Sequence, residues 1–278
     1  MRIAFQGEPG AYSEAAALTF AADADPVPCL SFEDVFAAVQ RGTATLGVLP
    51  MENSIGGSIH RNYDLLVEHE LPIVGEVELA VDHCLLARAG TSLPDLKVVY
   101  SHPQALAQCE RYLKGLEGVE IIAVYDTAGG AKMVADGTAS GAAAVASRRA
   151  ADVFGLEILA EGIQDYAANI TRFVVIARTA APPQPATKTS IVFSLKSTPG
   201  ALFRALSGFA LRDINLTKLE SRPIRGRPWE YLFYVDVDVP RDSLAFGRAI
   251  TNLAEFTDWV RVLGSYPGWS GSTSPIGE

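Results

Sequence analysis

The sequence predicts an α/β protein whose first part has two lobes and whose second part is a smaller domain of β-α-β-β-α-β order. Strand-like and helix-like segments alternate over residues 1–178, and the order of elements changes after residue 187. Such alternation is typical of mostly parallel sheets covered by helices. Between the two parts, residues 179–187 contain three prolines in nine residues, which predicts a semi-rigid linker.

In the first part, apolar runs predict strands at 2–6, 46–50, 97–100, 121–125, 142–146, 157–160 and 172–177. Helical spacing predicts helices at 13–21, 32–41, 61–69, 103–116, 128–136 and 147–154. The long strand-like segment 72–88 contains no helix and is expected to carry the chain from one sheet to another. We therefore expect lobe 1 at about 1–80 and 163–178 and lobe 2 at about 81–162, with a ligand cleft between them.

The second part is predicted as a domain over residues 188–267. Strands are expected at 189–196, 216–223, 229–239 and 259–266, and helices at 200–212 and 242–256. This order is the split βαβ, or ferredoxin-like, plan. Residues 268–278 are rich in glycine and serine, which predicts a flexible tail.

Composition excludes several classes of function. The formal net charge is -9 and no block of lysine and arginine stands out, which argues against a nucleic-acid surface. The three cysteines, Cys29, Cys84 and Cys109, form no C-x-x-C motif, and the four histidines show no metal-ligand spacing. We expect no metal and no cofactor. With no signal peptide and no apolar run of membrane-spanning length, the expected location is cytoplasmic.

Residues 7–14, GEPGAYSE, follow a predicted strand and open a predicted helix. The glycines would let backbone N–H groups face an anion at the helix N-terminus, and Ser13 is a plausible N-cap. A plain turn between strand and helix is the equal alternative.

Other polar residues follow predicted strands, where side chains commonly face a ligand crevice. Residues 50–58, PMENSIGGS, favour a site over simple capping. In residues 101–104, SHPQ, His102 has the chemistry of a general base, although a structural histidine is the better expectation. In residues 126–130, DTAGG, Thr127 either caps the helix or contacts a ligand.

Residues 169–173, NITRF, begin an apolar strand. Alternation places Thr171 and Phe173 on one face of this strand and Arg172 on the other. A hydroxyl, a guanidinium and an aromatic ring together suit a small anionic ring, whereas the alternative is an edge strand with a surface arginine. In the second part, residues 200–203 (GALF) and 220–223 (ESRP) form no catalytic set. They suit either an amino acid held by the backbone or ordinary turns.

Taken together and in order, GEPGAYSE, PMENSIGGSI, SHPQALAQC, DTAGGAK, NITRF, GALF and ESRP resemble the prephenate dehydratase family. The resemblance implies a two-lobed, periplasmic-binding-protein-like catalytic domain followed by a ferredoxin-like ACT domain that binds amino acids. It implies decarboxylating dehydration of prephenate to phenylpyruvate without a cofactor, and regulation by L-phenylalanine. Met51 departs from the family's usual isoleucine. The chain is also similar to plant arogenate dehydratases through GGSIHRNYDLL and AEGIQD, so arogenate stays open as the substrate.

The resemblance also implies roles for individual residues. Thr171 would assist departure of the hydroxyl group, Arg172 would bind a carboxylate and Phe173 would pack on the ring. The implied substrate-binding residues are Tyr12, Ser13, Glu52, Asn53, Ser54, Ser101, Gln108, Thr127 and Asn169. The implied effector-binding residues are Gly200, Ala201, Leu202, Asn215, Leu216, Glu220, Ser221, Arg222 and Pro223.

Ferredoxin-like domains expose one sheet face and an edge, so we expect a homodimer or homotetramer. The alternative from another class is a non-catalytic amino-acid-sensing binding protein, because two lobes around a cleft also describe solute receptors. An assay for phenylpyruvate formation distinguishes the two.

Overall fold

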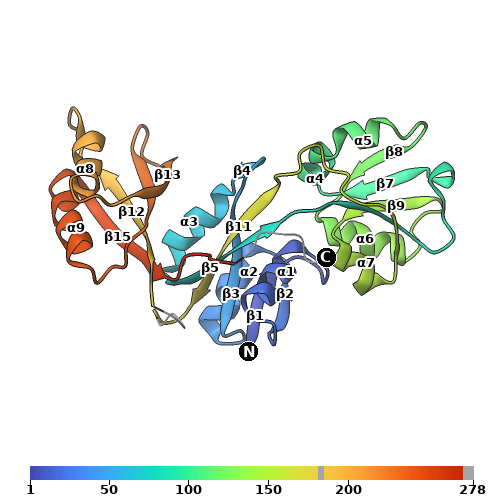
Figure 1. Cartoon of the computed structure of the whole chain (residues 1–278), viewed down its shortest axis with the longest axis horizontal. Coiled ribbons are helices and arrows are strands. Elements are labelled where there is room, and N and C mark those ends of the chain that lie inside the picture. The colour runs from blue at the N-terminus through green and yellow to red at the C-terminus, as the bar shows by residue number, and fades with distance from the viewer. Residues whose placement is uncertain (181–184, 272–278) are drawn as a thin grey trace. The chain divides into compact units, whose positions relative to one another are not determined.

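The computed structural model describes residues 1–180 and 185–271. Contacts divide the chain into two compact units, of which the first contains Met1–Asn62 and Val77–Phe173 and the second contains Tyr63–Glu76 and Val174–Ser270. Residues 181–184 of the predicted linker and 272–278 of the predicted tail lie outside the described residues. Figure 1 shows the elements along the chain.

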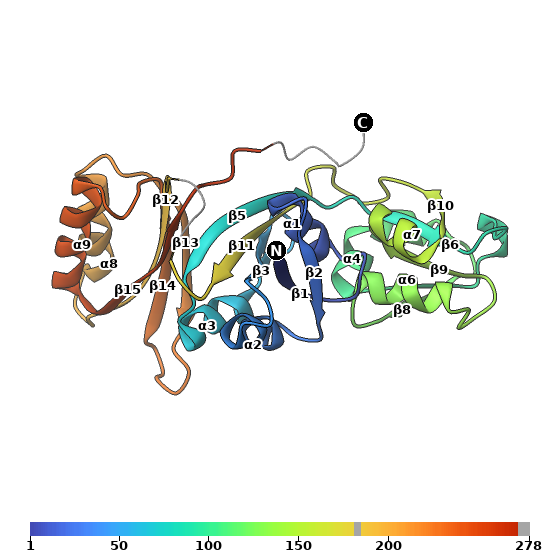
Figure 2. The same ribbon diagram turned by 90° about the horizontal axis from the view of Figure 1, so that it is seen from below.

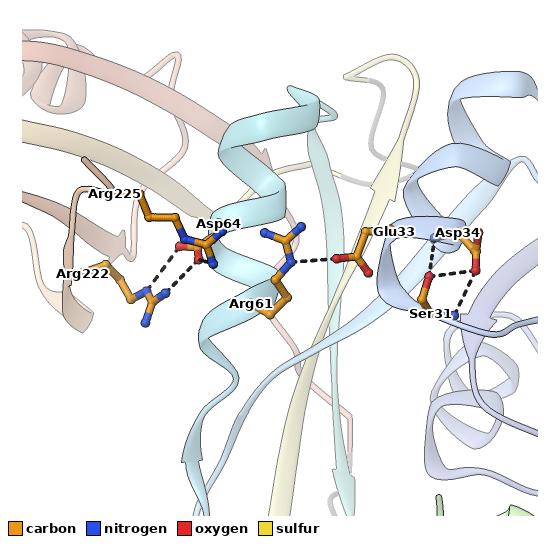
Figure 3. Close-up of polar contacts among 7 residues, drawn as sticks. All are labelled: Ser31, Glu33, Asp34, Arg61, Asp64, Arg222 and Arg225. Carbon is orange, nitrogen blue, oxygen red and sulfur yellow. Dashed lines mark hydrogen bonds and ion pairs between the residues drawn. The ribbon is translucent and has the colours of Figure 1, made fainter. Parts of the chain in front are cut away.

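The first sheet of the first unit contains parallel strands β1 (Arg2–Gln6), β2 (Asp25–Cys29) and β3 (Leu46–Asn53). The start of β11 (Ile170–Ala177) lies beside β3, and the short β4 (Gly57–Ser58) folds back on it. Helix α1 (Tyr12–Phe20) follows β1 and helix α2 (Phe32–Arg41) follows β2. A capping box between Ser31 and Asp34 starts α2. Figure 3 shows this cap and the neighbouring Arg61–Glu33 ion pair.

The second sheet of this unit has the strand order β10 (Glu157–Ala160), β6 (Cys84–Ala87), β9 (Ala142–Ala146), β7 (Val98–Ser101) and β8 (Glu120–Ala123). Strand β7 is parallel to β8 and β9, whereas β6 is antiparallel to β9 and β10. Helices α6 (Thr127–Ala135) and α7 (Arg148–Phe154) cover one face, and α4 (Pro103–Gln108) and α5 (Glu110–Lys114) cover the other (Figure 1). A 3₁₀ turn, η1 (Leu93–Asp95), precedes β7.

The second unit has the predicted β-α-β-β-α-β order. It contains β12 (Lys188–Leu195), α8 (Ala201–Ala210), β13 (Leu216–Pro223), β14 (Tyr231–Val237), α9 (Leu244–Phe256) and β15 (Thr257–Tyr266). The sheet order is β13-β14-β12-β15, and β15 pairs with the start of β5 (Ile73–Ala80) at Gly264 and Ile73. Helices α8 and α9 pack side by side on one face (Figures 1 and 2), around a core that includes Phe193, Phe209 and Leu253.

Residues 63–76 complete the second unit from the first half of the sequence. Half of them belong to α3 (His60–His69). Tyr234 donates from its hydroxyl to the carbonyl of Tyr63 at 3.1 Å, and Arg261 donates to the carbonyl of Leu66 at 2.7 Å. Tyr234 alternates with the core residues Val235 and Phe233 of β14, so α3 contacts the sheet face opposite α8 and α9.

The predicted fold class is confirmed, and the differences are local. β2 is absent from the predicted strands, and its segment DPVPC contains two prolines, which are tolerated because β2 ends the sheet order. The predicted helix 103–116 is interrupted at Cys109, and the predicted strand 72–88 is divided into β5 and β6. Among the described residues, no helix has both the length and the apolar character needed to cross a membrane.

Candidate active site

Four polar side chains from three predicted motifs converge in the first unit. Asn53 ends β3, Gln108 ends α4, Asn169 precedes β11 and Thr171 lies within β11. Asn53 donates from Nδ2 to Asn169 Oδ1 at 2.7 Å and to Thr171 Oγ1 at 3.0 Å. Gln108 donates from Nε2 to Asn53 Oδ1 at 3.1 Å, and Asn169 donates from Nδ2 to Gln108 Oε1 at 3.0 Å. All four are buried, and Asn169 is only 1% exposed.

The turn after β3 fixes the orientation of Asn53. Its Oδ1 accepts hydrogen bonds from the backbone N–H groups of Ile55 at 3.1 Å and Gly56 at 2.7 Å. A Cβ at position 56 would lie 1.9 Å from Gln104 Nε2 and 3.3 Å from Asn53 Oδ1, so the exposed Gln104 side chain would have to move. The PMENSIGGS motif therefore presents the Asn53 amide in one defined direction.

His83 belongs to this cluster, and sequence reasoning missed it. It is 2% exposed, with Nε2 2.9 Å from Gln108 Oε1 and Nδ1 3.1 Å from the Tyr12 hydroxyl. Burial lowers the pKa of His83, although the hydrogen bond to Gln108 partly opposes that shift, so the neutral imidazole is favoured. The available signal was a histidine in VDHCLLA, directly before the apolar residues 84–87.

A cavity of about 450 Å³ has Tyr12 in its wall, and the Tyr12 hydroxyl contacts His83 of the cluster. Its walls come from both sheets of the first unit, which matches the predicted cleft. Three predicted substrate-binding residues line it, namely Tyr12, Ser13 and Thr127. His102, Tyr125 and Asp126 line it as well. A larger cavity of about 690 Å³ shares only Tyr12 with the first. None of the four clustered polar residues lines either cavity.

The expected anion site in GEPGAYSE is occupied by the protein's own carboxylates. The backbone N–H of Glu8 donates to Asp126 Oδ2 at 3.0 Å, and that of Gly10 donates to Glu14 Oε2 at 2.7 Å. Of the two readings, the turn is therefore favoured. Ser13 is not the N-cap, because α1 begins at Tyr12 after Ala11 and Ser13 lies inside the helix.

Several other predicted residues have local structural partners. Ser101 donates from Oγ to the carbonyl of Val145 at 2.6 Å and is fully buried. Ser54 donates to the carbonyl of Ala168 at 2.9 Å. His102 accepts a hydrogen bond from the Gln104 backbone as the N-cap of α4, and burial lowers its pKa. At α6, Asp126 caps the helix and Thr127 is its first residue.

Glu52 and Arg172 are half-buried, whereas Phe173 is 1% exposed and packs in the interior. Arg172 points away from the face that buries Thr171 and Phe173, as the alternation predicted. In the described part of the chain, no three histidine, cysteine or acidic side chains are grouped in a way that would hold a metal ion.

In the second unit, strand register divides the predicted effector residues between two ends of the sheet. Thr189 and Leu216 both pair with Val237, whereas Ser194 and Arg222 both pair with Leu232. Asn215 and Leu216 therefore lie at one end. The other end carries Glu220, Ser221, Arg222 and Pro223, together with Gly200, Ala201 and Leu202 at the start of α8.

Arg222 and Asn215 both donate hydrogen bonds from their side chains to aspartates of the second unit. Arg222 donates from Nη2 to Asp64 Oδ2 at 2.8 Å, as Figure 3 shows, and both side chains are mostly buried. Asn215 donates from Nδ2 to Asp238 Oδ2 at 3.1 Å.

Comparisons with known proteins agree with this architecture. The family model described as prephenate dehydratase matches residues 3–181, and that described as ACT domain matches residues 189–254. Arogenate dehydratase/prephenate dehydratase 2 of Arabidopsis thaliana, a chloroplastic protein, is 52% identical over 96% of this chain and 73% of its own length.

Two solved structures are similar along nearly the whole chain. Prephenate dehydratase from Arthrobacter aurescens in complex with L-Phe is 31% identical, with a TM-score of 0.87 over 99% of this chain and 92% of that one. GqqA, described as a novel type of quorum quenching acylase, is 38% identical, with a TM-score of 0.88 over 97% of this chain and 99% of that one. The family match, the motif order and the two-part fold lead to one conclusion: the chain belongs to the prephenate dehydratase family.

Proposed function

We propose that this protein is a carbon–oxygen lyase that converts prephenate to phenylpyruvate, with arogenate as the alternative substrate. The observation that carries the proposal is the buried polar cluster around Thr171, which hydrogen bonds through His83 connect to Tyr12 in the wall of a cavity. Purified protein is incubated with each substrate in parallel, and phenylpyruvate absorbance or phenylalanine formation is followed. Absence of both products would contradict the proposal.

The chemistry requires help for a departing hydroxyl group. The bond to the ring carboxylate breaks, its electron pair enters the ring, carbon dioxide leaves, and the hydroxyl departs with a proton as water. A threonine hydroxyl is a weak acid, so we propose that Thr171 donates a hydrogen bond to the departing oxygen. Such assistance typically contributes about 10²–10⁴-fold to the rate.

We further propose that Arg172 binds a substrate carboxylate, because two parallel hydrogen bonds from its planar guanidinium group would orient the substrate. Phe173, which is 1% exposed, would shape the site from the interior, and the polar residues that line the cavity would hold the substrate in place. Orientation and fixed dipoles would then supply most of the rate enhancement.

Phenylalanine is proposed as the effector of the second unit, most simply as an inhibitor. The ACT match over residues 189–254 supports this, as does a related structure that contains L-Phe. Since register separates the two groups of predicted residues, a site shared by two copies is the arrangement that unites them. A coupling free energy of about 1–3 kcal/mol between effector and substrate sites would change affinity roughly 5–150-fold.

Calorimetry with phenylalanine tests the effector proposal on the full chain. Ser221→Tyr should weaken binding, because Ser221 is exposed among the predicted effector residues. Thr217→Tyr is the control, since Thr217 is exposed on β13 but outside the predicted set. No heat with wild-type protein at millimolar phenylalanine, or equal binding by both variants, would contradict this site.

The proposed assembly is a homodimer or homotetramer. In the sheet order, β13 is an edge strand with β14 as its neighbour, and the side chain of Leu219 on it is 47% exposed. Such an edge favours pairing with another copy. Sedimentation at micromolar concentration should give at least the mass of two chains, and a species of single-chain mass alone would contradict it.

We also propose the predicted division into a catalytic domain (1–178), linker (179–187), ACT domain (188–267) and tail (268–278). The gap between the two family models, from 181 to 189, falls at that linker. The cytoplasm is the proposed location. The free, buried thiols of Cys84 and Cys109 suit a reducing compartment.

A further inference from the structure

We propose that Asn53, Gln108 and Asn169 form a directed ring of amides, clamped by His83, that keeps the hydroxyl proton of Thr171 available for the departing group. This inference rests on the proposed lyase activity and assigns these residues a positioning role. It differs from the expectation that the three amides contact the substrate, because their polar atoms are engaged with one another.

The direction of the ring follows from Asn53. Two backbone N–H groups, which can only donate, point at its Oδ1 from residues 55 and 56. Its Nδ2 must therefore face Asn169 and Thr171, and both protons of Nδ2 have acceptors there. The orientation of this amide is fixed by neighbours that have only one possible role.

The other two amides follow in sequence around the ring. Asn53 donates to Asn169 at 2.7 Å, Asn169 donates to Gln108 at 3.0 Å, and Gln108 donates back to Asn53 at 3.1 Å. Reversing one amide would place two donors or two acceptors against each other. Because the ring is buried, such a mismatch would cost free energy of folding. Hydrogen bonds that run in one direction also strengthen one another by polarisation.

His83 holds the ring in this direction from outside. Gln108 presents Oε1 to His83 Nε2, so the proton of the neutral imidazole lies on Nε2. The Tyr12 hydroxyl lies 3.1 Å from His83 Nδ1 and donates its proton to the carbonyl of Asp82 at 2.6 Å, so the assignment of the imidazole proton to Nε2 rests on Gln108 and not on Tyr12. Burial raises the pKa of Tyr12, so the phenol keeps its proton. A flipped Gln108 would turn its NH₂ group toward the Nε2–H of His83.

The consequence appears at Thr171. Its Oγ1 accepts from Asn53 Nδ2 at 3.0 Å, and among the described residues Oγ1 donates to no acceptor. A hydroxyl has one proton, so that proton stays available for a substrate oxygen. If Asn53 were turned over, its Oδ1 would take the Thr171 proton and the donor would be lost.

The sharpest test is Asn53→Asp, which keeps the shape but replaces Nδ2 by a second oxygen. At neutral pH the carboxylate accepts the Thr171 proton, so kcat should fall at least about 100-fold with a smaller change in KM. Every hydrogen-bond partner of Asn53 in the described chain is neutral, namely the backbone N–H groups of 55 and 56, Gln108, Asn169, Thr171 and the carbonyl of Ile170. As pH falls, the protonated carboxyl regains a donor. The kcat of the variant, divided by that of wild type, should therefore rise.

Gln108→Glu should show the same rise at acidic pH, because a carboxylate there cannot donate to Asn53. Asn252→Asp on α9 is the matched control for the added charge and should keep the wild-type pH profile. Thermal melts establish that each variant is folded. A folded Asn53→Asp enzyme whose pH profile is parallel to that of wild type overturns the inference.

Variants and NMR of His83 provide an independent test of the inference. His83→Gln offers an amide near the position of Nε2 and should retain more kcat than His83→Leu, which offers no donor. Nitrogen NMR of the wild-type imidazole should show the proton on Nε2, and a proton on Nδ1 alone overturns the inference even if the protein processes neither substrate. Inactive wild-type protein with the Nε2 tautomer would instead overturn the proposed activity alone.

Discussion

Replacing Thr171 by valine removes one hydroxyl from the centre of the cluster and leaves the shape almost unchanged. Thr171 is 7% exposed, and its Oγ1 accepts from Asn53 Nδ2 at 3.0 Å. An unsatisfied buried donor costs about 1–3 kcal/mol of stability. Asn53 Nδ2 also lies 3.3 Å from the carbonyl of Ile170, which can accept the freed hydrogen bond. We therefore expect the free energy of unfolding to fall by about 1 kcal/mol, the low end of this range.

The effect on catalysis should be several times larger. Loss of general-acid assistance costs about 10²–10⁴-fold in kcat, or about 2.7–5.4 kcal/mol of activation free energy. Thr171→Ser keeps the hydroxyl and should retain much more kcat than Thr171→Val, while Thr171→Ala should resemble the valine variant.

The two effects are measured separately. Urea unfolding gives the change in stability, and phenylpyruvate absorbance under saturating prephenate gives kcat. A folded Thr171→Val enzyme with kcat within tenfold of wild type would remove Thr171 from the catalytic step. A serine variant as slow as the valine variant would show that shape, not the hydroxyl, decides the rate.

Three further predictions concern other features of the chain. Arg172→Lys should mainly raise KM, because lysine cannot reproduce the planar fork, and an unchanged KM would exclude the carboxylate role. Gly10→Ala should destabilise the protein by more than the roughly 1–2 kcal/mol that a left-handed conformation costs a non-glycine residue. The reason is that φ is +91° and that a Cβ would also lie 2.8 Å from the backbone of α7. Gly155→Ala, with φ +64° and open space, is its control in the same unfolding assay. Alkylation of native protein at pH 8 should spare Cys84 and Cys109, whose pKa values burial raises to about 11 and about 12. Rapid modification of either thiol without unfolding would contradict this.

The order of elements could be predicted because most strands here are apolar and separated by helices with clear spacing. β2 shows the limit, since an edge strand can contain prolines that a central strand excludes. The split of the helix after Gln108 was equally hidden, because 103–116 has continuous helical spacing and only the structure shows the break at Cys109.

Individual residues of the site could be found at strand ends, but their mutual contacts could not. Asn53 and Thr171 are 118 positions apart, and Asn53 and Gln108 are 55 apart, so no local pattern connects them. Sequence reasoning accordingly placed the amides against the substrate. His83 escaped notice because its side-chain partners, Gln108 and Tyr12, come from distant segments of the sequence.

The segment at residues 63–76 has a consequence for how such proteins can evolve. The contacts of Asp64 with Arg222 and of Glu76 with Lys188, at 2.8 Å and 2.5 Å, join the sequence before the linker to the sequence after it. A gene fusion that replaced everything beyond residue 187 would bring in a sheet selected against a different α3. Recombination at the linker would therefore succeed only when the incoming sequence carried residues at 188 and 222 that are compatible with Glu76 and Asp64. Substitutions at positions 64 and 222 should accordingly covary among related proteins.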